Sequence, residues 1–175
     1  MVLAGLATRG QVRANQSDVL VRFDDSVGVT PILSFAPPQN VDLTFANVAL
    51  NVVRGVNPSG NPWKIDELTG VIHDDGRISV GGRGLMISGG DLIGQSLTLR
   101  IFATLVCELM PPFVKHSTNS DPQQVDPIRL DVNGDFRIDA TLTSVPTECP
   151  FPVLLIRGLN NGAWIAAALP KNVAP

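Results

Sequence analysis

The sequence predicts an all-β protein: an antiparallel β-sandwich with little helix, or, as the alternative, a closed β-barrel. Three observations support this fold class. Apolar and polar residues alternate along most of the chain, which is the two-residue period of a strand. The 16 glycines and 14 prolines are spread between these runs rather than clustered. Asp-Gly and Asn-Gly dipeptides, which favour tight hairpin turns, separate several of them.

The first third of the chain predicts strands at residues 19–23, 27–29 and 32–35, followed by a longer alternating run over 41–52. The alternation in that run shifts by one residue near Ala46 and Asn47. A shift of one residue inside a β run is what an inserted residue produces. We therefore expect a β-bulge there.

The middle of the chain holds one segment where helix competes with strand, residues 63–73. Ile65 and Leu68 stand three apart, which suits a helix, but strand is the preferred interpretation. Asp75 and Gly76 then predict a hairpin turn between two β runs. Gly84 interrupts the next run and predicts a bulge or a close backbone approach.

Residues 95–107 form the clearest alternating run, and we expect one long strand that bends or crosses between sheets. The polar positions become apolar towards its end, which predicts burial on both faces there. Its regularly spaced apolar set is Leu97, Leu99, Ile101, Ala103, Leu105 and Cys107.

The last third predicts a loop over 111–127 and then a second hairpin at Asn133-Gly134, joining 128–130 to 135–143. A central strand follows at 153–157. The turn at 160–162 leads from it into a final strand at 164–169, which Pro170 ends.

The length suits one domain, which we place at residues 17–171. Residues 1–16 are expected to be an N-terminal arm that adds a strand to a partner, or else the remnant of a trimmed signal peptide. Residues 172–175 are expected to be a short tail.

Cys107 and Cys149 are the two cysteines, and we expect them to form a disulfide. The alternative is a pair of buried thiols in a reducing compartment. The disulfide is preferred because the chain has few lysines and many Asn, Ser, Thr and Gly turns, a composition that suits an extracytoplasmic protein.

No set of residues in the sequence predicts a catalytic, cofactor or metal site. The two histidines, His73 and His116, are too few for a zinc centre of the usual kind. The run from Asp131 to Asp135 begins like a calcium loop, but Phe136 stands where such a loop needs glycine. The acidic hairpin tips are therefore interpreted as solvated turns.

The charge pattern and the lengths of the apolar runs exclude nucleic-acid binding and a membrane-spanning helix. The net charge is −3 and the basic residues are scattered, whereas nucleic-acid binding needs a clustered basic surface. No apolar run approaches the roughly 20 residues that cross a bilayer as a helix. We expect neither nucleic-acid binding nor a membrane span.

Three stretches, residues 75–90, 133–139 and 149–157, together with Trp164, resemble a loose group of uncharacterised secreted bacterial proteins. The resemblance extends from about residue 63 to 171. It implies export and a compact all-β fold, and it transfers no activity, site residue or cofactor.

Taken together, the sequence predicts a non-enzymatic, secreted or cell-surface β domain that acts by association. A homo-oligomer that forms a structural subunit of a surface or extracellular assembly is the leading hypothesis. A β-barrel that binds a small apolar ligand, with weak enzymatic activity, is the alternative.

Overall fold

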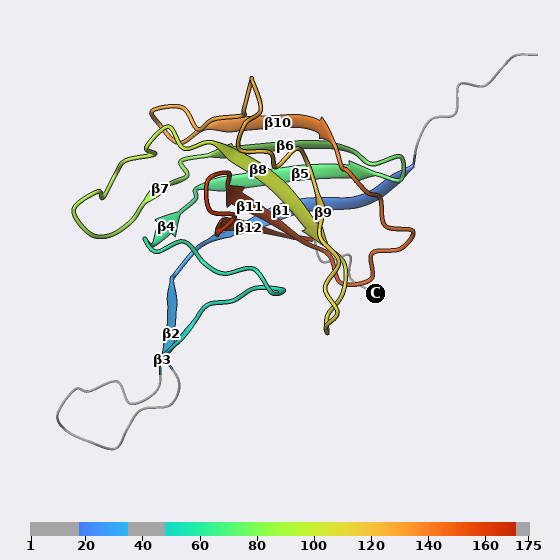
Figure 1. Cartoon of the computed structure of the whole chain (residues 1–175), viewed down its shortest axis with the longest axis horizontal. Helices are drawn as coiled ribbons and strands as arrows, with labels where there is room; N and C mark the ends of the chain where they lie inside the picture. Colours follow the sequence, from blue (N-terminus) through green and yellow to red (C-terminus); the bar gives the residue numbers. More distant parts are fainter. Residues whose placement is uncertain (1–17, 35–47, 171–175) are drawn as a thin grey trace, which may run out of the picture.

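The computed structural model describes residues 18–34 and 48–170, and all regular structure within them is β (Figure 1). Eight strands form one antiparallel sheet in the order β10-β6-β5-β1-β12-β11-β8-β9. In chain order these strands are β1 (Val19–Gly28), β5 (Glu67–His73), β6 (Arg77–Arg83), β8 (Ile101–Val106), β9 (His116–Ser117), β10 (Phe136–Thr141), β11 (Val153–Gly158) and β12 (Trp164–Pro170).

Two small antiparallel sheets accompany the large one. The first joins β2 (Ile32–Ser34) to β3 (Val48–Leu50), and the second joins β4 (Trp63–Lys64) to β7 (Met86–Ile87). The predicted preference for strand over 63–73 is confirmed, since β4 and β5 occupy most of that segment.

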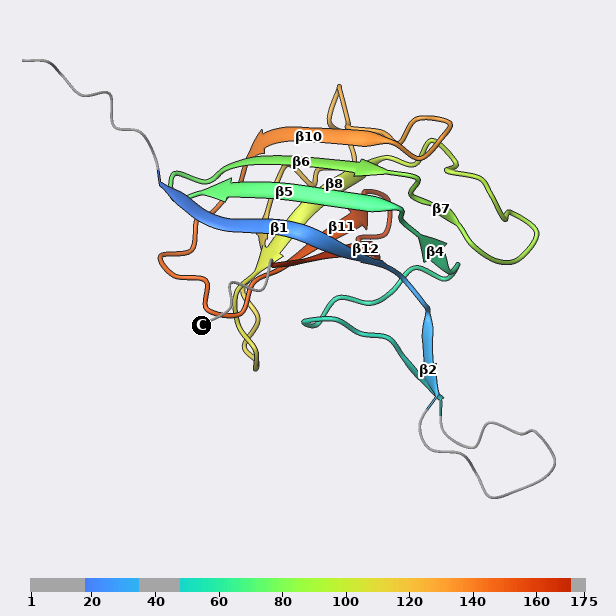
Figure 2. The same cartoon turned by 180° about the vertical axis from the view of Figure 1, so that it is seen from behind.

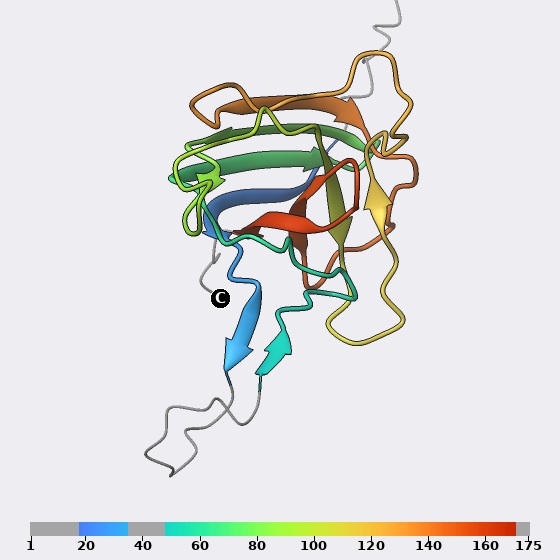
Figure 3. The same cartoon turned by 60° about the vertical axis from the view of Figure 1, so that its left-hand side comes forward.

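The large sheet curls into a half-barrel, which Figure 3 shows from its side. At one end of the curl the Thr143 N–H donates a 2.7 Å hydrogen bond to the Ser117 carbonyl, linking the chain after β10 to β9. The all-β prediction is confirmed. The sheet encloses its core by curling on itself, an arrangement between the predicted sandwich and its barrel alternative.

The core follows from the alternation that the sequence shows. In β5 and β6 every second side chain is buried, so one face of each strand points into the curl. Strand β8 is buried on both faces, as expected for the end of the 95–107 run. The largest fully buried side chains are Leu68, Ile72, Leu85, Ile87, Ile101, Leu105, Leu130, Ile138, Leu154, Leu155, Ile156 and Ile165.

Two of the predicted turns form as expected. Gly76 has a φ of +85° and its N–H bonds to the His73 carbonyl at 3.0 Å, so β5 and β6 are a hairpin. The 160–162 turn likewise returns β11 into β12. Here Arg157 Nε donates to the Gly162 carbonyl at 2.7 Å.

The expected long strand over 95–107 is wrong in length, because β8 begins only at Ile101. Leu97 and Thr98 have φ values of +55° and +42°, which no strand accommodates. The Ser96 hydroxyl stabilises this turn by accepting from the Thr98 N–H at 3.2 Å. Alternation of residue types continues through the turn, which is why the sequence did not reveal it.

The second predicted hairpin also differs from the structure. The turn exists, with the Gly134 N–H bonded to the Asp131 carbonyl, but β10 pairs with β6 and not with 128–130. Arg129 instead bridges to Arg100 beside β8. The turn therefore connects two different edges of the curled sheet.

Gly84 meets the prediction of a close approach: its φ is +65° and a Cβ there would overlap the Asp66 carboxylate. The expected bulge at 46–47, the N-terminal arm at 1–16 and the tail at 172–175 lie outside the described residues.

Candidate functional site

A two-stranded arm leaves the body of the protein at the end of β1 (Figures 1 and 2). We define the arm as residues 29–34 and 48–53, which contain β2 and β3. No residue of these two ranges is charged. Leu50 is 59% exposed and Val52 is 48% exposed, so the arm presents aliphatic side chains to solvent.

The arm is a regular antiparallel ladder close to the body. Ile32 pairs with Leu50, and Ser34 pairs with Val48. The Asn51 N–H extends the ladder with a 3.0 Å bond to the Pro31 carbonyl, and the Asn51 side chain donates to the Thr30 carbonyl at 2.9 Å.

Both tryptophans of the chain fix the root of the arm. Trp164, 2% exposed, donates from Nε1 to the Asn51 carbonyl at 2.9 Å. The Trp63 N–H donates to the Val29 carbonyl at 2.9 Å. Gly28 allows this approach, since a Cβ there would lie 2.7 Å from the Trp63 carbonyl carbon. The arm is thus held firmly where it joins the core.

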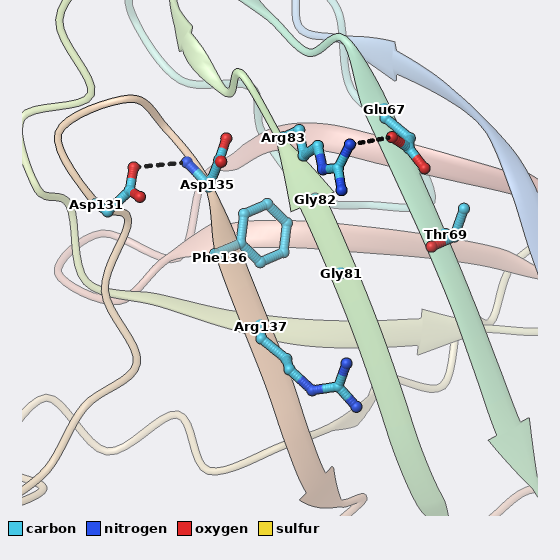
Figure 4. A pocket seen from close by; sticks show the side chains of 9 residues that line it. All are labelled: Glu67, Thr69, Gly81, Gly82, Arg83, Asp131, Asp135, Phe136 and Arg137. Carbon is cyan, nitrogen blue, oxygen red and sulfur yellow. Dashed lines mark hydrogen bonds and ion pairs between the residues drawn. The ribbon is translucent and has the colours of Figure 1, made fainter.

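A second feature is a hollow of about 420 Å³ on the outer face of β10, β6 and β5 (Figure 4). Gly81 forms part of its floor, and a Cβ on Gly81 would meet no atom within 4 Å. Arg83 and Glu67 form an ion pair of 3.5 Å at one side. Arg137 stands at another side of the hollow.

Arg137, which lines this hollow, forms an ion pair with Asp139 on the same strand. Arg137 lowers the pKa of the Asp139 carboxyl, chiefly by a side-chain hydrogen bond, and Ser79 adds a second one. Asp139 in turn raises the pKa of Arg137.

The cysteines predicted to pair lie at disulfide distance. The sulfur atoms of Cys107 and Cys149 are 1.98 Å apart and their Cα atoms 4.6 Å apart. The bridge ties the residue after β8 to the loop before β11, across a sequence separation of 42 residues. It therefore stabilises one end of the body, away from the arm.

The residues considered for chemistry in the sequence stay apart. His116 is buried and its Nδ1 lies 2.9 Å from the Ser144 hydroxyl, whereas His73 closes β5 beside the first hairpin. The Asp131 carboxylate accepts from the N–H groups of Asn133 and Asp135, which is turn chemistry. Among the described residues no cluster of three potential metal ligands occurs.

Comparison with known protein families, curated proteins and solved structures found no match to this chain. The arm is therefore identified as the candidate site from its exposed side chains and its hydrogen bonds alone. No helix of the described residues is long and apolar enough to cross a membrane.

Sequence reasoning did not identify the arm as a feature of interest. The signal was present: two uncharged ranges, 26–34 and 48–53, in a chain of which 17% is charged. What the sequence does not show is that these strands pair with each other away from the large sheet.

Proposed function

We propose that this protein is a non-enzymatic β domain of an extracytoplasmic compartment that acts by association, as a structural subunit of an assembly. The observation that carries the proposal is the arm, whose Leu50 and Val52 are exposed on a root fixed by Trp164.

The arm has the physical properties of a binding element. A two-stranded ribbon by itself is marginally stable in water, and packing against a further layer stabilises it. Each aliphatic side chain buried on association contributes about 1.5–3 kcal/mol when its burial is complete. At the root, the hydrogen bonds to the Asn51 and Val29 carbonyls fix where the arm leaves the body.

The proposed location draws support from the disulfide. A bridge such as Cys107–Cys149 forms and persists in oxidising compartments and is rare in the cytosol. The low number of lysines and the frequent polar turns are consistent with the same environment.

The test is the mass of the protein in solution, measured by sedimentation velocity over a range of concentrations. We expect the wild type to associate as concentration rises. The double variant Leu50→Asp, Val52→Asp is expected to bind at least about tenfold more weakly, because burying two carboxylates in an apolar contact is costly.

The matched control is Val125→Asp, an equally drastic change at a fully exposed valine in the 119–127 loop, remote in sequence from the arm. It should associate like the wild type. A wild type that stays monomeric at the highest concentration, or a control that loses association as fully as the double variant, would contradict the proposal.

The ligand-binding alternative requires an empty interior. Fully buried side chains such as Leu68, Ile72 and Leu85 belong to the core cluster that occupies the curl of the sheet. Because the described interior is filled by side chains, we do not propose that function.

A further inference from the structure

The loop between β8 and β9 exposes a run of apolar side chains. Residues 109–114 read Leu-Met-Pro-Pro-Phe-Val, and we call them the apolar loop. Met110 is 71% exposed, Leu109 is 53% exposed and Val114 is 49% exposed. Hairpin loops are usually built from Gly, Asn, Asp and Ser, whose side chains and backbones suit tight turns. A run of exposed apolar residues in such a place indicates a binding function.

The apolar loop projects from the body in the same direction as the arm. Figures 1 and 3 show the chain leaving the end of β8, extending beyond the sheet and returning to β9. In both views β2 and β3 point the same way as this loop. The apolar loop is therefore a convex tip, not a groove or a flat face.

The base of the apolar loop is fixed by contacts to the rest of the protein. Cys107, one half of the disulfide, directly precedes Glu108. The Glu108 carboxylate accepts a hydrogen bond from the Val114 N–H at 3.2 Å, which closes the loop on itself. The Arg54 guanidinium lies over the Phe113 ring, 6.0 Å from its centre. These contacts fix where the tip leaves the body.

Two cations lie at the base of the apolar loop. Lys115 follows it in the chain and donates from Nζ to the Gly55 carbonyl at 3.3 Å, next to Arg54. Within the described part of the chain, neither Arg54 nor Lys115 forms an ion pair. Glu108 is the one carboxylate in the sequence ranges 53–56 and 108–115. Two cations less one carboxylate give these ranges a charge of +1, in a chain whose net charge is −3.

We propose that the apolar loop inserts into the surface of an anionic lipid bilayer, with Arg54 and Lys115 placed against the headgroups. The loop is separate from the arm in the sequence, so this inference goes beyond the proposed function and adds a lipid partner to it.

Shape, charge and length favour a lipid surface over a second protein. A bilayer accepts a convex tip of any shape, whereas a protein partner needs a matching cavity. Anionic headgroups attract Lys and Arg held close to the surface, which matches the two cations at the base. Six residues folded back on themselves reach about 10 Å, and interfacial segments are buried to about 5–10 Å.

The test is co-sedimentation with vesicles of phosphatidylcholine containing about one third phosphatidylglycerol, and with vesicles of phosphatidylcholine alone. We expect the wild type to bind the anionic vesicles more tightly than the neutral ones, and to bind them less tightly as salt increases. Met110→Asp should bind the anionic vesicles at least about tenfold more weakly, because its carboxylate would enter an apolar region beside negative headgroups.

Ile93→Asp is the matched control. Ile93 is 65% exposed in the loop after β7, and its nearest charged neighbour in the chain is Asp91. This variant should bind vesicles like the wild type. Lys115→Gln should lower the affinity for anionic vesicles about fivefold and leave the affinity for neutral vesicles unchanged. Far-ultraviolet circular dichroism and the unfolding midpoint establish first that all three variants are folded.

A wild type that does not sediment with anionic vesicles would overturn the inference. Equal binding by Met110→Asp and the wild type would do the same, as would equal losses for Met110→Asp and Ile93→Asp. If the wild type ignores vesicles and Met110→Asp loses self-association without lipid, the loop binds a second copy and the inference fails. Sedimentation velocity without lipid tests the proposed function separately, since a wild type that binds vesicles but stays monomeric contradicts only the association through the arm.

Discussion

The body and the arm are made of similarly apolar strands, yet they bury their side chains to very different extents. In the body, β8 lies in the curled sheet and is buried on both faces. In the arm, β2 and β3 pair only with each other among the described strands, and Leu50 remains largely exposed. The comparison teaches that alternation makes a strand, whereas burial needs a second layer.

The largest expected effect concerns the bridge that stabilises the body. Replacing Cys107 and Cys149 together by serine should lower the free energy of unfolding by about 4 kcal/mol, the chain-entropy value for a loop of this length. Urea denaturation of the variant and of the wild type measures it. A change below about 1 kcal/mol would show that the body does not depend on the bridge.

An effect of similar size concerns the root of the arm. Trp164→Ala should cost about 3–5 kcal/mol, because it empties a buried site and removes the bond to the Asn51 carbonyl. Trp164→Phe keeps most of the ring and should cost clearly less. Urea unfolding followed by circular dichroism compares them. Equal losses for both variants would mean that the hydrogen bond, not the packing, holds the root.

A smaller effect is expected where the backbone of β4 packs closely against Gly28, the last residue of β1. Gly28→Ala should cost about 1–3 kcal/mol, since the added methyl group would meet the Trp63 backbone. Gly81→Ala, on the open outer face of β6, is the matched control and should not destabilise. Thermal unfolding of both variants measures the contrast. Similar unfolding midpoints for the two variants would show that the Trp63 backbone moves aside without loss of stability.

The smallest effect is expected on the charged outer face of the body. The pKa of Asp139 is lower in the folded protein than in the unfolded chain, so its contribution is present above the ordinary carboxyl pKa. It is lost as pH falls through the folded value. Asp139→Asn should therefore differ slightly from the wild type near neutral pH and converge with it in acid. Unfolding midpoints across pH test the sign; a difference that grows in acid would contradict it.

The features that could be predicted from the sequence are the local ones. Turn chemistry at Gly76 and at 160–162, the strand periodicity and the cysteine pair depend on neighbouring residues or on residue type. The prediction of one long strand over 95–107 was wrong because Leu97 and Thr98 adopt positive φ, although neither residue type favours it. The hydrogen bond of Ser96 to the Asp131 carbonyl, 35 residues away, stabilises that turn, and no local pattern reports it.

By itself, the sequence determined that this chain forms strands and that turns fall at Gly76 and at 160–162, because these properties depend on side-chain type and on a two-residue period. Only the tertiary structure decided that β10 pairs with β6, that one sheet curls into a half-barrel, and that the arm stands apart from it. Strand pairing is chosen by contacts between residues far apart in the chain, and several pairings satisfy the same alternation.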